Sequence, residues 1–113
     1  MNSKEIKEQR DFLNCYKTLT KEQELKLEEL DFRELIMCCL AYGTDVMTSR
    51  DINMVSEYYG RPYFDEYADK LGRERALEIY EDQKRFFDTK CIVKKNVYTD
   101  CEGVTYNSVV ELD

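Results

Sequence analysis

Residues 32–42 read FRELIMCCLAY, a stretch in which nearly every side chain is apolar. A helix that is apolar on one face lies at a surface, whereas a helix that is apolar all round has to be buried. The stretch is far shorter than the roughly 20 apolar residues that cross a bilayer. We therefore predict that residues 32–42 form the central helix of the fold, with Gly43 ending it as a left-handed residue.

Two capping-box patterns precede this stretch. Thr20 with Gln23, and Asp31 with Glu34, have the spacing in which one side chain caps a helix start and the other reaches back to it. The first box starts a leucine-rich helix. The second either opens a new helix at residue 32 or lies inside one long helix, and two caps so close together favour a break near Leu30.

Residues 3–18 have the pattern of a surface helix. Ser3 can cap its first turn. Ile6, Leu13 and Tyr16 share one helical face, and the remaining positions are mostly charged or polar. The narrow apolar stripe predicts a helix that lies on the core rather than inside it.

Further helices are predicted between the apolar stretch and residue 88. One is capped by Thr48 or Ser49, carries Ile52, Val55 and Tyr59 on its inner face, and ends at Gly60. Pro62 suits the first position of the next helix. Gly72 either separates that helix from residues 73–88 or kinks it, and the inner face of the last helix carries Ala76, Ile79, Tyr80 and Phe87.

The chain then becomes rich in Val, Ile, Tyr and Thr, which favours strands. Asp100 and Gly103 fit a tight turn closed by a left-handed glycine, so residues 90–112 are predicted to form a β-hairpin. A four-residue loop would pair Val97 with Tyr106, whereas a three-residue loop with a bulge would pair Tyr98 with Tyr106. A one-residue slip exchanges the two faces of a strand, so both registers stay open.

These elements predict an α+β fold in one domain, residues 1–113, with a helical part over 3–88 and a hairpin over 90–112. We expect a small bundle of four to six helices, with the hairpin packed on them because an isolated hairpin is marginal in water. A chain of 113 residues is within the usual size of one domain.

The composition excludes most catalytic classes. The chain has no histidine, which removes the commonest acid-base and nucleophile-base pairs. Its four glycines are isolated, so no phosphate-binding loop is present. Asp65 with Asp69, and Glu74 with Glu78, could share a cation, but a solvated helix face is the simpler interpretation. We predict no catalytic residue, no cofactor and no metal, and hence not an enzyme.

The five cysteines form no disulfide framework and no CxxC pair, and Cys38 and Cys39 read as small buried side chains. The N-terminal residues MNSKEIKEQRD lack the apolar run of a signal peptide. A cytoplasmic protein that does not enter a membrane is the resulting expectation.

Residues 58–67, YYGRPYFDEY, combine four tyrosines, a phenylalanine and an arginine, which are residue types enriched at interface hot spots. We expect Tyr59, Phe64 and Tyr67 to pack inside and Tyr58 and Tyr63 to lie at the surface. An acidic series follows at helical spacing. The predicted partner-binding surface comprises Tyr58, Tyr59, Arg61, Tyr63, Asp65, Glu66, Asp69, Glu74, Glu78 and Asp82.

A compact, acidic, tyrosine-rich chain without a catalytic set is typical of small accessory proteins of phages and mobile elements. The leading hypothesis is a non-enzymatic protein-binding module that modulates or inhibits a nucleic-acid-handling partner by occupying a basic groove. The net charge is −7 and acidic residues outnumber basic ones throughout the chain, so direct binding of nucleic acid is not expected. A homodimer is possible through the first helix or a hairpin edge.

The alternative is a winged-helix-like DNA-binding transcriptional regulator, because the order of helices followed by a hairpin matches that architecture. Residues 50–59, or the following helix, would then read the major groove. Among residues 49–60 only Arg50 and Asn53 suit contacts with base edges, and Asp51 and Glu57 accompany them.

Overall fold

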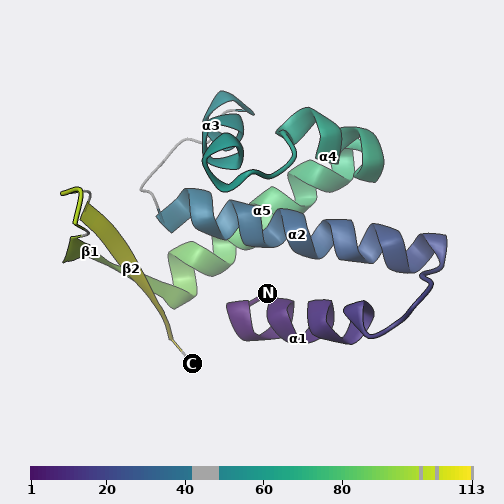
Figure 1. The fold of residues 1–113 in the computed structure, drawn as a ribbon, viewed down its shortest axis with the longest axis horizontal. Helices are drawn as coiled ribbons and strands as arrows, with labels where there is room; N and C mark the ends of the chain where they lie inside the picture. Colours follow the sequence, from purple (N-terminus) through teal and green to yellow (C-terminus); the bar gives the residue numbers. More distant parts are fainter. Residues whose placement is uncertain (42–48, 100, 104, 113) are drawn as a thin grey trace.

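The computed structural model describes residues 1–41, 49–99, 101–103 and 105–112. Within these residues the chain forms five α-helices and then a two-stranded antiparallel hairpin, which confirms the α+β class (Figure 1). The elements are α1 (Ser3–Asn14), α2 (Lys21–Ala41), α3 (Ser49–Tyr59), α4 (Phe64–Leu71), α5 (Arg73–Lys90), β1 (Cys91–Thr99) and β2 (Thr105–Glu111).

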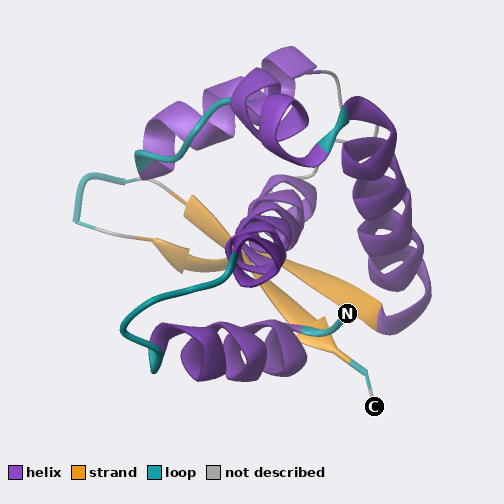
Figure 2. Cartoon of the chain, turned by 90° about the vertical axis from the view of Figure 1, so that its right-hand side faces the viewer, coloured by secondary structure: helices purple, strands orange, loops and turns teal. Residues whose placement is uncertain are grey.

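Helix α2 is the centre of the molecule. Figure 1 shows it crossing between α1 on one side and α3 and α4 on the other, with α5 behind it. The end-on view in Figure 2 shows the same helix surrounded by the others. The prediction of a central helix is therefore confirmed over residues 32–41, while the proposed end at Gly43 lies outside the described residues.

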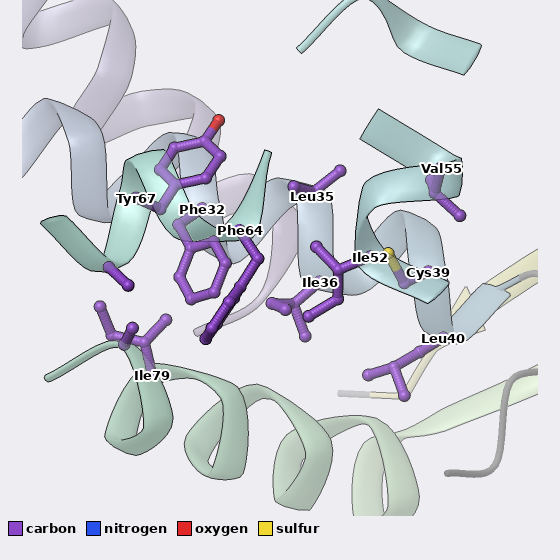
Figure 3. Close-up of a cluster of buried hydrophobic side chains, with 12 residues drawn as sticks. Phe32, Leu35, Ile36, Cys39, Leu40, Ile52, Val55, Phe64, Tyr67 and Ile79 are labelled. Atoms are coloured by element: carbon purple, nitrogen blue, oxygen red, sulfur yellow. The ribbon is translucent and has the colours of Figure 1, made fainter. Parts of the chain in front are cut away.

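The main core lies between α2 and the three helices that follow it (Figure 3). Phe32, Leu35 and Ile36 of α2 are fully buried. The ring of Phe32 lies 5.0 Å from that of Tyr67 and 6.0 Å from that of Phe64, measured between centroids. Burying each large apolar side chain stabilises the fold by about 1.5–3 kcal/mol, so α2 supplies much of the driving force for folding.

A second, smaller apolar cluster holds α1 on α2. Ile6 and Leu13 of α1 are buried against Leu30. This confirms the inner face predicted for the first helix. However, α1 ends at Asn14 rather than near residue 18, so Tyr16 lies beyond it and remains exposed.

The predicted break near Leu30 is wrong, because α2 runs through this position without interruption. The carboxylates of the second capping pattern form ion pairs with other elements instead of capping a helix. Asp31 pairs with Arg10 of α1 at 2.9 Å, and Glu34 pairs with both Arg10 and Arg61. A capping box is recognised from local spacing alone. Here the same two carboxylates bind arginines from other parts of the chain, so they do not cap a helix.

The start of α2 is capped as the sequence predicts, whereas the start of α1 is capped by a different residue. Thr20 and Gln23 form the predicted capping box, with N···O distances of 2.9 and 3.2 Å. At the start of α1, Asn2 rather than Ser3 accepts the first-turn N–H, at 2.7 Å. The backbone N–H and the hydroxyl of Ser3 donate instead to the carboxylate of Glu111 in β2. A tertiary partner therefore replaces the predicted local one.

Gly60 ends α3 as predicted and sets the direction of the next segment. Its φ is 66°, in the left-handed region that favours glycine. The N–H of Arg61 donates to the carbonyl of Ser56 at 2.8 Å, which is the long bond of a Schellman motif. Helix α4 begins only at Phe64, so the prediction that Pro62 occupies the first helical position is wrong.

Gly72 separates α4 from α5 rather than kinking one helix, and its φ is 89°. The inner face of α5 is the predicted one. Ala76 and Ile79 are fully buried, and Tyr80 and Phe87 pack on the main core while partly exposed. Helix α5 therefore packs its apolar face against one side of α2.

The hairpin combines two registers. Tyr98 lies opposite Tyr106 near the turn, as in the bulged alternative, and Gly103 has a φ of 84°. An irregularity between Lys94 and Tyr98 then shifts the pairing, so that Val93 lies opposite Val109. The four-residue-loop register is therefore not adopted, and of the two pairings that the sequence left open the structure has Tyr98 opposite Tyr106. Asp100 lies outside the described residues.

Alternation along the strands gives the base of the hairpin two different faces. The half-buried face, which lies toward α1 and α2, carries Cys91, Val93, Val109 and Glu111. The opposite face is exposed and carries Ile92, Lys94 and Val110.

A charged side chain is buried where α2 meets α5. Arg33 is only 7% exposed, and its guanidinium donates to Asp82 at 2.6 Å and to the side-chain oxygen of Gln83 at 2.8 Å. The same Gln83 oxygen accepts from the amino group of Met1 at 3.0 Å. Arg33 thus satisfies a buried amide and fixes the approach of α5 to α2.

We predict that Arg33→Met lowers the free energy of unfolding by about 1–3 kcal/mol, because Gln83 loses a partner inside the core. The measurement is urea unfolding at neutral pH. Arg73→Met, an exposed arginine-to-methionine change on α5, is the matched control and should stay within about 0.5 kcal/mol of the wild type. Equal effects of the two changes would contradict the assigned role of Arg33.

The cost of Arg33→Met should also depend on pH. The hydrogen bond from Arg33 lowers the pKa of Asp82 below its ordinary value of 3.8. A lowered carboxyl pKa contributes stability above that ordinary value and loses it as the pH falls through the folded value. The difference between wild type and variant should therefore be largest above about pH 5 and shrink in more acidic solution. Unfolding titrations at several pH values measure it, and a pH-independent difference would contradict the pairing.

Candidate functional site

Three tyrosines are exposed where α3 turns into α4. Tyr58 is 62% exposed, Tyr59 47% and Tyr63 43%. The rings of Tyr58 and Tyr59 are perpendicular, at 89°, with centroids 5.0 Å apart. Exposed aromatic side chains with a polar end are suited to protein contacts. We call these three tyrosines, together with the exposed Asp65, Glu66 and Asp69 of α4, the α3–α4 corner.

The expected division of the aromatic residues is correct except at Tyr59. Phe64 and Tyr67 are buried, and Tyr58 and Tyr63 lie at the surface, as predicted. Burial raises the pKa of Tyr67 to about 12, so its hydroxyl stays protonated. Tyr59 is exposed because α3 ends at this residue, one turn beyond the core contacts of Val55.

Arg61, one of the predicted surface residues, is directed into the structure. Its guanidinium pairs with Glu34 and donates to the backbone carbonyl of Asp31 at 3.2 Å. Its side chain is 23% exposed. Arg61 therefore positions the corner against α2 rather than presenting a free charge to a partner.

The acidic side chains of α4 remain at the surface. Asp65, Glu66 and Asp69 are exposed, and in the part of the chain that the structure describes none of the ion pairs includes them. Lys70, which lies four residues after Glu66 on α4, contacts Glu28 of α2 at 3.4 Å. The corner therefore combines aromatic rings with carboxylates that take part in none of the ion pairs among the described residues.

The acidic series on α5 is less uniform than its spacing suggests. Glu74 is exposed, but Glu78 contacts Arg75 at 3.1 Å, and Asp82 is turned toward Arg33. Arg75 also binds Glu29 of α2 at 2.8 Å and lowers the pKa of that carboxyl. The α4 carboxylates and Glu74 thus remain surface charges, whereas Asp82 is the ion-pair partner of the buried Arg33.

Met54 belongs to the same surface but was not predicted. It is 63% exposed and lies one helical turn before Tyr58 on α3. The four-residue spacing between the two was visible in the sequence. The sequence alone does not show which apolar stripe of α3 faces the core, the one with Ile52 and Val55 or the one with Met54 and Tyr58, so Met54 was not predicted to be exposed.

The polar residue best suited to base contacts is occupied elsewhere. The side-chain oxygen of Asn53 accepts the backbone N–H of Phe64 at 2.8 Å, which caps the start of α4. Arg50, the other candidate reader on α3, is exposed. Of these two residues, only Arg50 is therefore left to contact base edges if α3 enters the major groove of DNA.

The other candidate chemistries have no assembled site among the described residues. No group of three or more Cys, Asp or Glu side chains there is placed to hold a metal ion. Burial raises the pKa of Cys39 to about 12 and also raises the pKa of Cys38, so both thiols stay protonated. In the same residues, no helix combines the length and apolar character needed to cross a membrane.

Comparison of the chain with protein-family models, with curated proteins and with solved structures finds no match in any of the three.

We predict that Arg61→Ala lowers the free energy of unfolding by about 1–3 kcal/mol, because it removes charged hydrogen bonds at a partly buried position. Asp69→Asn, an exposed change in the same region, should stay within about 0.5 kcal/mol of the wild type. Thermal and urea unfolding measure both. If Arg61→Ala were as neutral as Asp69→Asn, Arg61 would have to be returned to the contact surface.

Proposed function

We propose that this chain is a non-enzymatic protein-binding module whose α3–α4 corner contacts a partner. The observation that carries the proposal is the exposure of Tyr58, Tyr59 and Tyr63 beside Met54. Large apolar side chains are normally withdrawn from water, and a cluster of them at a surface marks an interaction site. Tyrosine also loses little conformational entropy when it is ordered in an interface.

The charge around these rings favours a basic partner. Asp65, Glu66 and Asp69 are the acidic residues of the corner, and the chain as a whole carries a charge of −7. Opposite charge around an apolar contact speeds encounter and selects the partner. A basic groove that handles nucleic acid offers such a surface, because it is built to bind phosphates. We infer that the module modulates or inhibits a protein of that kind, as an accessory protein of a phage or mobile element would.

The DNA-binding alternative receives less support. Of its two candidate readers on α3, Asn53 caps α4 rather than facing outward. The carboxylates of α4 would also repel the phosphates of any duplex that approached the corner. The protein-binding proposal accounts for both the rings and the charges, whereas the DNA-binding one accounts for neither.

The test is capture of partners from host lysate by the wild type and by Tyr58→Ala/Tyr63→Ala/Asp65→Lys. We expect at least one protein to be captured by the wild type, to be recovered at least tenfold less with the variant, and to be displaced by added duplex DNA. Displacement is expected because the corner and the nucleic acid would occupy the same basic groove.

Phe12→Ala/Tyr16→Ala is the matched control, since it removes another exposed pair of edge-to-face rings, with centroids 5.5 Å apart, from a different surface. It should leave capture unchanged. Equal recovery with the corner variant would show that the corner is not the contact surface. Capture that DNA does not displace would refute the nucleic-acid-handling partner while leaving the surface in place.

A further inference from the structure

The outer face of the hairpin is a second exposed apolar surface. Ile92 and Val110 lie directly opposite each other on β1 and β2, and both are exposed, at 50% and 37%. Leu112, which follows β2, is 47% exposed. Because directly paired residues of adjacent strands touch, these side chains form a continuous patch rather than scattered groups.

Among the described residues, the charged side chains on this face of the hairpin are basic. Lys94 lies two positions beyond Ile92 and is exposed on the same face, and Lys90 is exposed at the base of the hairpin. The nearby carboxylate of Glu111 belongs to the opposite face, where it binds Ser3. In a chain with a net charge of −7, the described base of the hairpin therefore presents an apolar surface with positive flanks.

The α3–α4 corner has the complementary character, with exposed rings and a negative border. The other exposed aromatic pair, Phe12 with Tyr16, does not, because α1 has three basic and three acidic residues, whereas α4 has three acidic residues and one basic one. Lysine ammonium groups form cation–π contacts with tyrosine rings and ion pairs with carboxylates. The corner is therefore the described surface that best matches the hairpin face.

We propose that the outer face of the hairpin binds the α3–α4 corner of a second copy of this chain. The inference rests on the proposed function in one respect, since both use the corner as a contact surface. Figure 1 shows the hairpin at one end of the long axis, with α4 well apart from it, so α4 does not lie against the hairpin of its own molecule. A contact between two different surfaces is heterologous, and it adds copies head to tail.

Head-to-tail contact makes a prediction that symmetric dimers do not. Ile92→Thr/Lys94→Glu/Val110→Thr blocks the hairpin face with residues that suit a strand, and Tyr58→Ala/Tyr63→Ala/Asp65→Lys blocks the corner. Each variant alone should be monomeric, whereas an equal mixture should form a 1:1 dimer, because one intact copy of each surface remains. The wild type should grow beyond the dimer as its concentration rises from about 10 µM to about 1 mM.

Sedimentation or light scattering measures these masses, and circular dichroism confirms that each variant is folded. Should the triple hairpin variant unfold, Lys94→Glu alone should weaken association at least tenfold. Phe12→Ala/Tyr16→Ala should associate like the wild type. A wild type that stays monomeric, a mixture that does not associate, or association lost in only one of the two blocked variants would each overturn the proposal. Partner capture that persists in the hairpin-blocked variant would leave the proposed function intact in all three cases.

Discussion

Helix α2 has to be covered on every side, and the rest of the fold follows from that constraint. Its residues between Leu30 and Leu40 are mostly buried, so a surface position for this segment would expose apolar groups all round. The chain meets the requirement with α1 on one side, α3 and α4 on another and α5 behind, while the inner face of the hairpin lies at the C-terminal end of α2. At about 1.5–3 kcal/mol for each large buried side chain, no other element contributes comparably.

Charged side chains of α2 then decide where each neighbour is placed. Along the helix, Glu28, Glu29, Asp31, Arg33 and Glu34 contact partners on α1, α4, α5 and the segment after α3. Several of these pairs are partly buried, so their orientation matters more than their net energy. These pairs include Arg61 and Lys70, the basic residues on either side of the α4 carboxylates in the sequence. The negative border of the α3–α4 corner is therefore a consequence of how the helices are fixed to α2.

Two surfaces remain outside this arrangement. The corner presents tyrosines and carboxylates because α3 ends at Tyr59 and the chain turns at Gly60 before α4 begins. The hairpin presents Ile92 and Val110 because a two-stranded sheet can bury only one of its faces. Neither surface contributes to the main core, so substitutions there should separate binding from folding. That separation makes both proposals accessible to experiment with stable variants.

The sequence by itself determined the elements whose cause is local. The apolar stretch from Phe32 predicted the central helix, the Thr20–Gln23 box predicted where α2 begins, and the composition after residue 90 predicted the hairpin. The tertiary structure decided the cases in which a local or surface role competed with a partner on another element. Asp31 could cap a helix or bind Arg10, and Arg61 could serve a partner or bind Glu34. Both took the tertiary partner, because a charge next to the core is stable only when an opposite charge from another element accompanies it.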